Sequence, residues 1–430
     1  MNQKRVLRIE YSQQYPILSI LVAVALIMAA PFVSVWLSYG AFAICLYRVL
    51  RYDAKVFATD YAILAPFPYI FSMPGGLTLL IILCLIATVV YFVREGVKAD
   101  SAFVTILALL NYLIMRMQTN VNDFLLCFGQ MCLLWVLLPK QDAQSAERTA
   151  KLYCISLLVA SGYALLVNDT WQIQAKIGAG SEAFWGTGIM RLHGLVGDPN
   201  FYMTQLVVGI ALLAKLRNAG RIKMLPFLLM GITMAVLGAL TYSKTFLLVF
   251  VIFGVVYIIW QFRNKRILLG IALIVAVVLS AEFLLFSEYS PFAGVVSRLL
   301  ESTDMDGLTT GRSEIYKLYV QAIGKSAGSF FFGYGLSAPG AGADSHNIYL
   351  EILYHCGAVG LVLIVAFGVS LVAVIKRQMA DVKQSFIAKY VVLGMALMLF
   401  MTLNGLFMVV VYPSFFLGFL AILISPKESQ

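Results

Sequence analysis

Hydrophobic and polar positions alternate along this chain in blocks, with apolar runs of about twenty residues separated by short connections rich in Lys and Arg. A run of that length crosses the hydrocarbon core of a bilayer as a helix. The first apolar run, 15–50, is too long for one span and contains Pro31, so we expect two short helices there. Further helices are predicted at 56–72, 74–93, 101–117, 121–138, 152–168, 199–216, 222–240, 244–262 and 267–286, then a long helix from His346 to Arg377 and a final pair broken near Tyr412 and Pro413. The pattern predicts an all-α polytopic membrane protein of about 12 to 14 transmembrane helices, forming one integral membrane domain over 1–430.

Basic residues at alternate connections set the orientation of these helices. Lys and Arg mark cytoplasmic loops, and one assignment places every basic connection inside, including that of Arg48, Arg51 and Lys55. Both long connections, 168–198 and 287–346, then lie on the same extracytoplasmic face. Residues from both loops can therefore contribute to one site. The N-terminus has basic residues but no small-residue cleavage site, which indicates a retained first helix.

Composition excludes a water-soluble protein, because 61% of the residues are hydrophobic and only 12% are charged. The net charge of +10 lies in the short connections and is therefore no sign of nucleic-acid binding. The six cysteines fall mostly within apolar runs without metal-ligand spacing, so we interpret them as small buried hydrophobic residues. The chain shows no internal repeat, which disfavours a transporter built from two related halves.

The end of the first long loop combines a helix start with an arginine. Asp198 and Pro199 suit the cap and first position of the next helix, and that alone explains them. The free N–H groups and dipole of a helix start also favour an anion beside Arg191. Arg191 could equally extend to lipid phosphates at the membrane boundary.

The second long loop carries Arg298, an acidic run (Glu301, Asp304 and Asp306) and Thr310-Gly311-Arg312 at the start of an amphipathic stretch. Apolar residues recur there at helical spacing, which predicts a helix along the membrane surface. The helix dipole disfavours a cation in a first turn, so a ligand or partner explains Arg312 better than helix stability does. An ion pair with Glu314 or the acidic run is the alternative. Gly333-Tyr334-Gly335 and the segment 337–343 predict a flexible tract able to close over a substrate.

The next helix begins at His346 and Asn347. An interfacial histidine titrates near neutral pH and can act as a general base, although a structural role would also place it there. Glu351 and His355 are four residues apart and are expected to pair, which marks a polar cavity below the outer face. Two or three arginines with one imidazole can bind a lipid pyrophosphate and activate a hydroxyl without a metal ion.

These motifs carry a resemblance to a known family. Its elements are Arg191-x-x-Gly194, Gly197-Asp198-Pro199-Asn200, Thr241-Tyr242-Ser243-Lys244, Thr310-Gly311-Arg312, Gly333-Tyr334-Gly335, and His346-Asn347 followed by Gly357-Ala358-Val359-Gly360. Over about residues 150–375 the chain resembles the O-antigen ligase and O-antigen polymerase superfamily. The His-Asn motif with a glycine ten residues after the Asn is its most specific element.

The resemblance implies a bacterial inner-membrane glycosyltransferase with a GT-C-like fold, whose active site faces the periplasm or cell exterior. It would take a glycan from undecaprenyl pyrophosphate, with no nucleotide sugar, metal or cofactor. His346 would be the base, Arg191 would bind the pyrophosphate, and either Arg298 or Arg312 would be the second arginine. Lys244 stands where the family often has Arg and would be a secondary phosphate contact. Further substrate contacts are expected from Asn200, Tyr334, Asn347 and Glu351.

We favour a polymerase of repeat units for O-antigen, capsular or exopolysaccharide, because nothing in the chain identifies a lipid A acceptor. The alternative is an O-antigen ligase that transfers the finished polysaccharide to lipid A core. Expected partners are the lipid-linked donor, a glycan or lipid A core acceptor and membrane lipids. A chain-length regulator and a flippase are further possible partners, and no nucleic acid is expected to bind. A transporter or flippase of lipid-linked sugars is a third hypothesis, in which Glu351 and His355 would relay protons.

Overall fold

The computed structural model describes residues 15–73, 78–117, 121–167, 191–263, 292–300, 312–336, 338–342, 344–377, 386–403 and 411–424, with some single positions between 265 and 290. Several predicted features lie outside these residues: the first long loop up to residue 190, the acidic run, Thr310-Gly311 and most of the predicted span 267–286.

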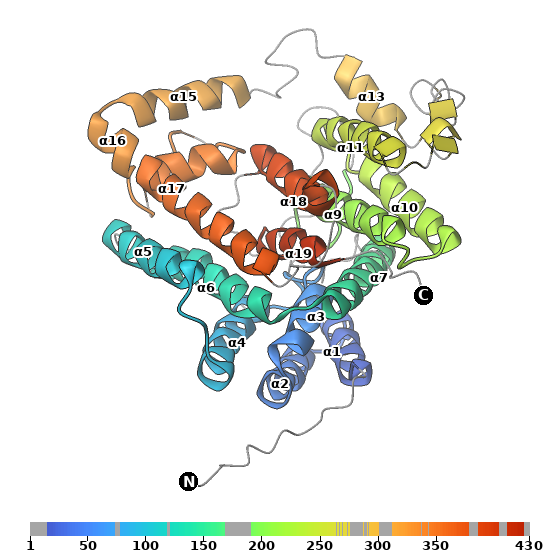
Figure 1. The fold of residues 1–430 in the computed structure, drawn as a ribbon, viewed down its shortest axis with the longest axis horizontal. Coiled ribbons are helices and arrows are strands. Elements are labelled where there is room, and N and C mark those ends of the chain that lie inside the picture. The colour runs from blue at the N-terminus through green and yellow to red at the C-terminus, as the bar shows by residue number, and fades with distance from the viewer. Residues whose placement is uncertain are drawn as a thin grey trace.

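Most of the described residues lie in helices, as the apolar pattern predicts (Figure 1). They are α1 (Ile17–Ala29), α2 (Trp36–Arg51), α3 (Ala54–Leu64), α4 (Leu79–Glu95), α5 (Ser101–Arg116), α6 (Val121–Leu137), η1 (Leu138–Lys140), α7 (Ala143–Val167), α9 (Pro199–Asn218), α10 (Met224–Ala239), α11 (Lys244–Arg263), α13 (Ala293–Leu300), α15 (Arg312–Gly324), α16 (Ala327–Phe332), α17 (Ile348–Arg377), α18 (Phe386–Leu399), η2 (Phe400–Thr402) and α19 (Tyr412–Leu423). Among the described residues, α7, α11 and α17 are long and apolar enough to cross a membrane, and several shorter helices are apolar as well.

Helix α9 forms the centre of the bundle, and almost every residue from Pro199 to Leu216 is buried. It packs against α7, α10, α11, α18 and α19. Its start follows the sequence prediction, because the Asp198 side chain accepts hydrogen bonds from the backbone N–H groups of Asn200 and Phe201 while Pro199 occupies the first turn. The core thus fixes Asp198 at one end of a rigid helix.

The segment Gly333-Tyr334-Gly335 is clamped onto a kink in α17. Gly357 breaks that helix with φ 64° and ψ −176°. The Tyr334 and Gly335 N–H groups donate to the carbonyls of Tyr354 and His355 at 2.8 and 2.9 Å, and His355 Nδ1 lies 2.9 Å from the Gly335 carbonyl. The backbone bonds correct the expectation of a loose tract at these three residues. We call this contact between residues 331–336 and 354–357 the clasp.

The clasp joins three helices at one edge of the molecule. Arg116, the last residue of α5, donates from Nη2 to the Gly333 carbonyl at 2.8 Å. Helix α16, which the apolar pattern did not predict, leads into the clasp and packs on α17. In Figure 1, α15 and α16 run along the edge opposite α1, α2 and α4. The clasp therefore fixes where α15 lies, and Arg312 is the first residue of α15.

Arg48, which the sequence grouped with the basic connection after α2, is a buried residue of the last turn of that helix. Arg48 lies in α2, is 1% exposed, and forms a two-pronged ion pair with Asp60 of α3 at 2.8 and 2.7 Å. Its third nitrogen donates to the Pro16 carbonyl at 2.7 Å. A buried arginine requires such a partner, and Asp60 supplies it from the next helix. All six cysteines are free, and all but the half-buried Cys132 are buried, as predicted.

Candidate active site

The end of the first loop is bonded to the turn between α10 and α11. Arg191 Nε donates to the Thr241 carbonyl at 2.8 Å, and the Leu192 N–H donates to the Leu240 carbonyl at 3.0 Å. Ser243 Oγ donates to Asn200 Oδ1 at 3.4 Å. Two motifs that are distant in sequence therefore form one surface, with Arg191, Asn200 and Lys244 on it.

His346 adopts an unusual backbone conformation directly before α17. Its φ is +48°, a left-handed value that non-glycine residues seldom adopt. Asn347 caps the helix, since its Oδ1 accepts from the N–H groups of Tyr349 and Leu350 at 3.1 and 3.3 Å. Buried Ser345 donates from Oγ to the Asn347 carbonyl at 2.9 Å. The neighbours on both sides thus hold His346 in its strained position, as is common for residues at functional sites.

Charges from three segments surround His346. Burial lowers the pKa of its imidazole, the positive charge of Arg312 lowers it further, and the carboxylates of Asp198 and Asp344 raise it in part. The net effect is a pKa below the ordinary value of about 6.5. The imidazole is therefore neutral at pH 7 and able to accept a proton.

Arg312 is half-buried beside the same groups. Burial lowers the pKa of its guanidinium, whereas the Tyr316 side chain, to which it is hydrogen-bonded, and Asp198 favour the charged form. Tyr316 in turn donates to the Met401 carbonyl at 3.5 Å. Glu314 pairs with Lys317 at 2.5 Å, so the ion pair considered for Arg312 is not made with Glu314. Charge interactions instead link Arg312 with Asp198 at the start of α9 and with His346.

The remaining predicted residues stand apart from this group of charges. The Tyr334 hydroxyl donates to the Ala322 carbonyl at 2.7 Å, and its ring stacks on Tyr354. Glu351 is buried, and together with burial its charge raises the pKa of Tyr319 to about 12. The expected pairing of Glu351 with His355 stays a prediction. The side chain of Arg298, in α13, is outside the described residues.

Sequence reasoning missed three members of the site. Asp198 was interpreted only as a helix cap, yet its charge also acts on His346 and Arg312. Tyr316 was not singled out within the surface helix, and Asp344 was included only as part of the long second loop. Asp344 could have been found from its position two residues before His346, but nothing local indicates the contact of Asp198 with residues so much later in the chain.

The arrangement suits a polyanion. The starts of α9 and α11 are linked by the bond between Ser243 and Asn200, and the charge of Asp198 links the start of α9 to His346 before α17, so the positive dipole ends of these helices add to Arg191, Lys244 and Arg312. Guanidinium groups bind phosphate oxygens in a two-pronged manner. Within the described residues no group of three or more His, Cys, Asp or Glu side chains has the geometry to hold a metal ion. The site therefore combines a cationic surface with one imidazole whose pKa is lowered.

Comparison with known proteins matches residues 227–365 to the family model described as O-antigen ligase. The matched segment includes Lys244, Arg312, the clasp and His346, and it confirms the resemblance to the O-antigen ligase and polymerase superfamily. Searches of curated proteins and of solved structures return no match. The family and the long apolar helices indicate a membrane protein of polysaccharide biosynthesis.

Proposed function

From the O-antigen ligase family segment at 227–365, we propose that the chain is a glycosyltransferase that takes its glycan from undecaprenyl pyrophosphate at the extracytoplasmic face of the bacterial inner membrane. His346 beside Arg312 and Asp198, at a surface where three helices begin, is the observation that carries the proposal. The pyrophosphate would bind at Arg191 and Arg312, with Lys244 as a further contact. We assign the second arginine to Arg312 because its charge acts on His346.

The reaction is a displacement at the anomeric carbon of the donor. His346 removes the proton from an acceptor hydroxyl, whose oxygen then forms the new glycosidic bond. The bond between the anomeric carbon and the pyrophosphate oxygen breaks, and its electron pair leaves with undecaprenyl pyrophosphate. The arginines stabilise the charge that develops on this leaving group. The imidazolium returns its proton to water, so the cycle requires neither a metal ion nor a cofactor.

Asn200 and Asn347 are each held by a side-chain hydrogen bond, which supports a further role for both amides as contacts to sugar hydroxyls. We further propose a bundle of about 12 to 14 spanning helices in a GT-C-like arrangement. Polymerisation of repeat units is our preferred reaction. Transfer to lipid A core is the second candidate, favoured by the description of the matching family model.

A glycan profile of a deletion strain tests the proposal. Wild type, His346→Ala and the exposed-surface control Lys317→Ala are added back, and undecaprenol-linked and surface-attached material are resolved by gel and mass spectrometry. Membrane levels of each variant are compared by immunoblotting. We expect His346→Ala to lose nearly all activity at normal level and Lys317→Ala to behave as wild type.

The products distinguish the candidate reactions. Single repeat units without long chains identify a polymerase, and long chains stranded on undecaprenyl pyrophosphate identify a ligase. An unchanged glycan pool would overturn both. Greater sensitivity at Glu351 or His355 than at His346 would support the transporter hypothesis instead.

A further inference from the structure

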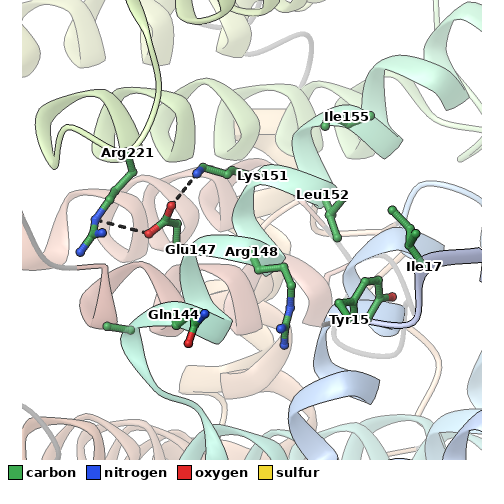
Figure 2. Close-up of a pocket in the computed structure, with 10 residues that line it drawn as sticks. Tyr15, Ile17, Gln144, Glu147, Arg148, Lys151, Leu152, Ile155 and Arg221 are labelled. Carbon is green, nitrogen blue, oxygen red and sulfur yellow. Dashed lines mark hydrogen bonds and ion pairs between the residues drawn. The ribbon is translucent and has the colours of Figure 1, made fainter. Parts of the chain in front are cut away.

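A cavity lies at the end of α9 opposite to His346. It has a volume of about 870 Å³ and is bordered by the start of α1, the first turns of α7 and the connection from α9 to α10. The basic connections predict that this end is cytoplasmic. Figure 2 shows side chains of all three segments pointing into the space, with Arg148 beside Tyr15 and Glu147 between Lys151 and Arg221. None of these residues belongs to the candidate active site.

The polar part of the cavity is cationic. Its lining has three cationic side chains, Arg148, Lys151 and Arg221, and one carboxylate, Glu147, which gives a net charge of +2. Glu147 is fully engaged, with Lys151 Nζ at 2.5 Å and Arg221 Nε at 3.3 Å. It therefore holds two cations in place at the rim while a positive excess remains.

Arg148 supplies that excess. Its guanidinium carbon lies 5.2 Å from the centre of the Tyr15 ring, and its Nε is buried without a hydrogen-bond partner. Asp60 acts on it only through charge, because that carboxylate is bonded to Arg48 and Tyr15. Arg148 as a whole is half-buried, and a guanidinium that lines a cavity with one donor unsatisfied is a group that an anion would complete.

An apolar groove continues from the cavity. It has a volume of about 800 Å³, lies between α1 and α2, and shares Ile17 with the cationic cavity. Leu18 on its wall is 75% exposed, and Ile155 at the edge of the first cavity is 51% exposed. A free phosphate ion would occupy only the cationic cavity. A molecule with an anionic head group and hydrocarbon tails would occupy both the cationic cavity and the apolar groove.

We propose that this cavity binds an anionic phospholipid, with its phosphate at Arg148 and Arg221 and an acyl chain along the groove between α1 and α2. Basic pockets between membrane helices on the cytoplasmic side are suited to such head groups. A lipid bound there would bridge the start of α1, the first turns of α7 and the connection from α9 to α10, all of which line the cavity. This site is independent of the proposed transferase activity.

Lipid binding to the purified full-length protein tests the proposal. Native mass spectrometry measures binding of dioleoyl phosphatidylglycerol and dioleoyl phosphatidylcholine, which share the same chains. The variants are Arg148→Gln, Arg221→Gln and the double change, with Arg263→Gln as a control of equal charge change at an exposed position in α11. Each is first checked for a monodisperse profile by size-exclusion chromatography.

We expect selective binding of phosphatidylglycerol by the wild type, about fivefold weaker in each single variant and about thirtyfold weaker in the double variant, with Arg263→Gln unchanged. If Arg148→Gln fails to fold, because its side chain borders Asp60, Arg221→Gln carries the test alone.

Three outcomes would overturn the proposal. Equal binding of the two lipids would show that charge is not recognised. Equal loss in Arg263→Gln would indicate general attraction of lipid to a basic surface. Displacement of phosphatidylglycerol by millimolar inorganic phosphate would assign the cavity to a small anion.

Discussion

The kink at Gly357 allows a quantitative prediction for Gly357→Ala. The backbone there has φ 64° and ψ −176°, a region that only glycine occupies readily, and placing alanine in it costs about 1–3 kcal/mol. An added Cβ would also lie 2.4 Å from the Phe331 carbonyl oxygen and 2.5 Å from the Phe332 nitrogen. These are backbone atoms of α16 and cannot move aside by rotation, so overpacking adds about 1–3 kcal/mol. We expect a total destabilisation of about 2–6 kcal/mol.

Gly368→Ala is the matched control within the same helix. Its added Cβ would meet only the Phe419 ring at 4.0 Å, and alanine in a helix interior stabilises by about 0.5–1 kcal/mol relative to glycine. Thermal unfolding is followed with a thiol-reactive dye, for which the fully buried Cys356 beside the kink is a direct reporter. Activity is followed with the glycan profile described above.

Gly357→Ala should expose its thiols at a clearly lower temperature than wild type and lose activity, because the clasp fixes the position of α15 and therefore of Arg312. Gly368→Ala should unfold at or slightly above the wild-type temperature and retain wild-type activity. Unfolding of the two variants at the same temperature, with activity retained, would refute the claim that the kink requires glycine.

Three further predictions follow from the site and the core. Activity should rise with pH along an acid limb centred below about 6.5, because His346 must be neutral and because burial and Arg312 lower its pKa. Arg312→Gln should reduce the rate and move this limb to higher pH. A limb that stays in place would show that the charge of Arg312 does not act on His346. Asp60→Asn should destabilise the protein by about 3–5 kcal/mol by leaving Arg48 buried without its counter-charge, measured by the same dye assay, whereas a shift as small as that of an exposed-residue variant would contradict the buried pair. Asn347→Ala should cost about 1 kcal/mol through loss of the α17 cap while Asn347→Asp retains stability, and equal melting of the two would show that the cap is unimportant.

Most helices could be predicted from the sequence because they depend on local pattern. Apolar runs gave most helix positions, and Asp198-Pro199 gave the start of α9. The kink at Gly357 was not predictable, since a glycine within an apolar run is compatible with a straight helix. The structure supplies a physical reason for that glycine, which sequence resemblance could only mark as part of a motif.

Long-range pairs account for the other differences. Arg48 looks like a loop cation until Asp60 is placed against it in the next helix. The charge of Asp198 acts on His346 because the fold brings the start of α9 near the residues before α17, and the sequence around either residue gives no sign of it. Local patterns therefore located the chemical groups, whereas tertiary packing decided which of them act together.

The buried pair of Arg48 and Asp60 also constrains how the protein enters the membrane. Either side chain alone within a bilayer is costly, yet the two lie on consecutive helices joined by only Tyr52 and Asp53. The pair can form as soon as this short hairpin has left the ribosome, before any later helix exists. We therefore expect α2 and α3 to leave the translocon together as one neutralised unit during synthesis.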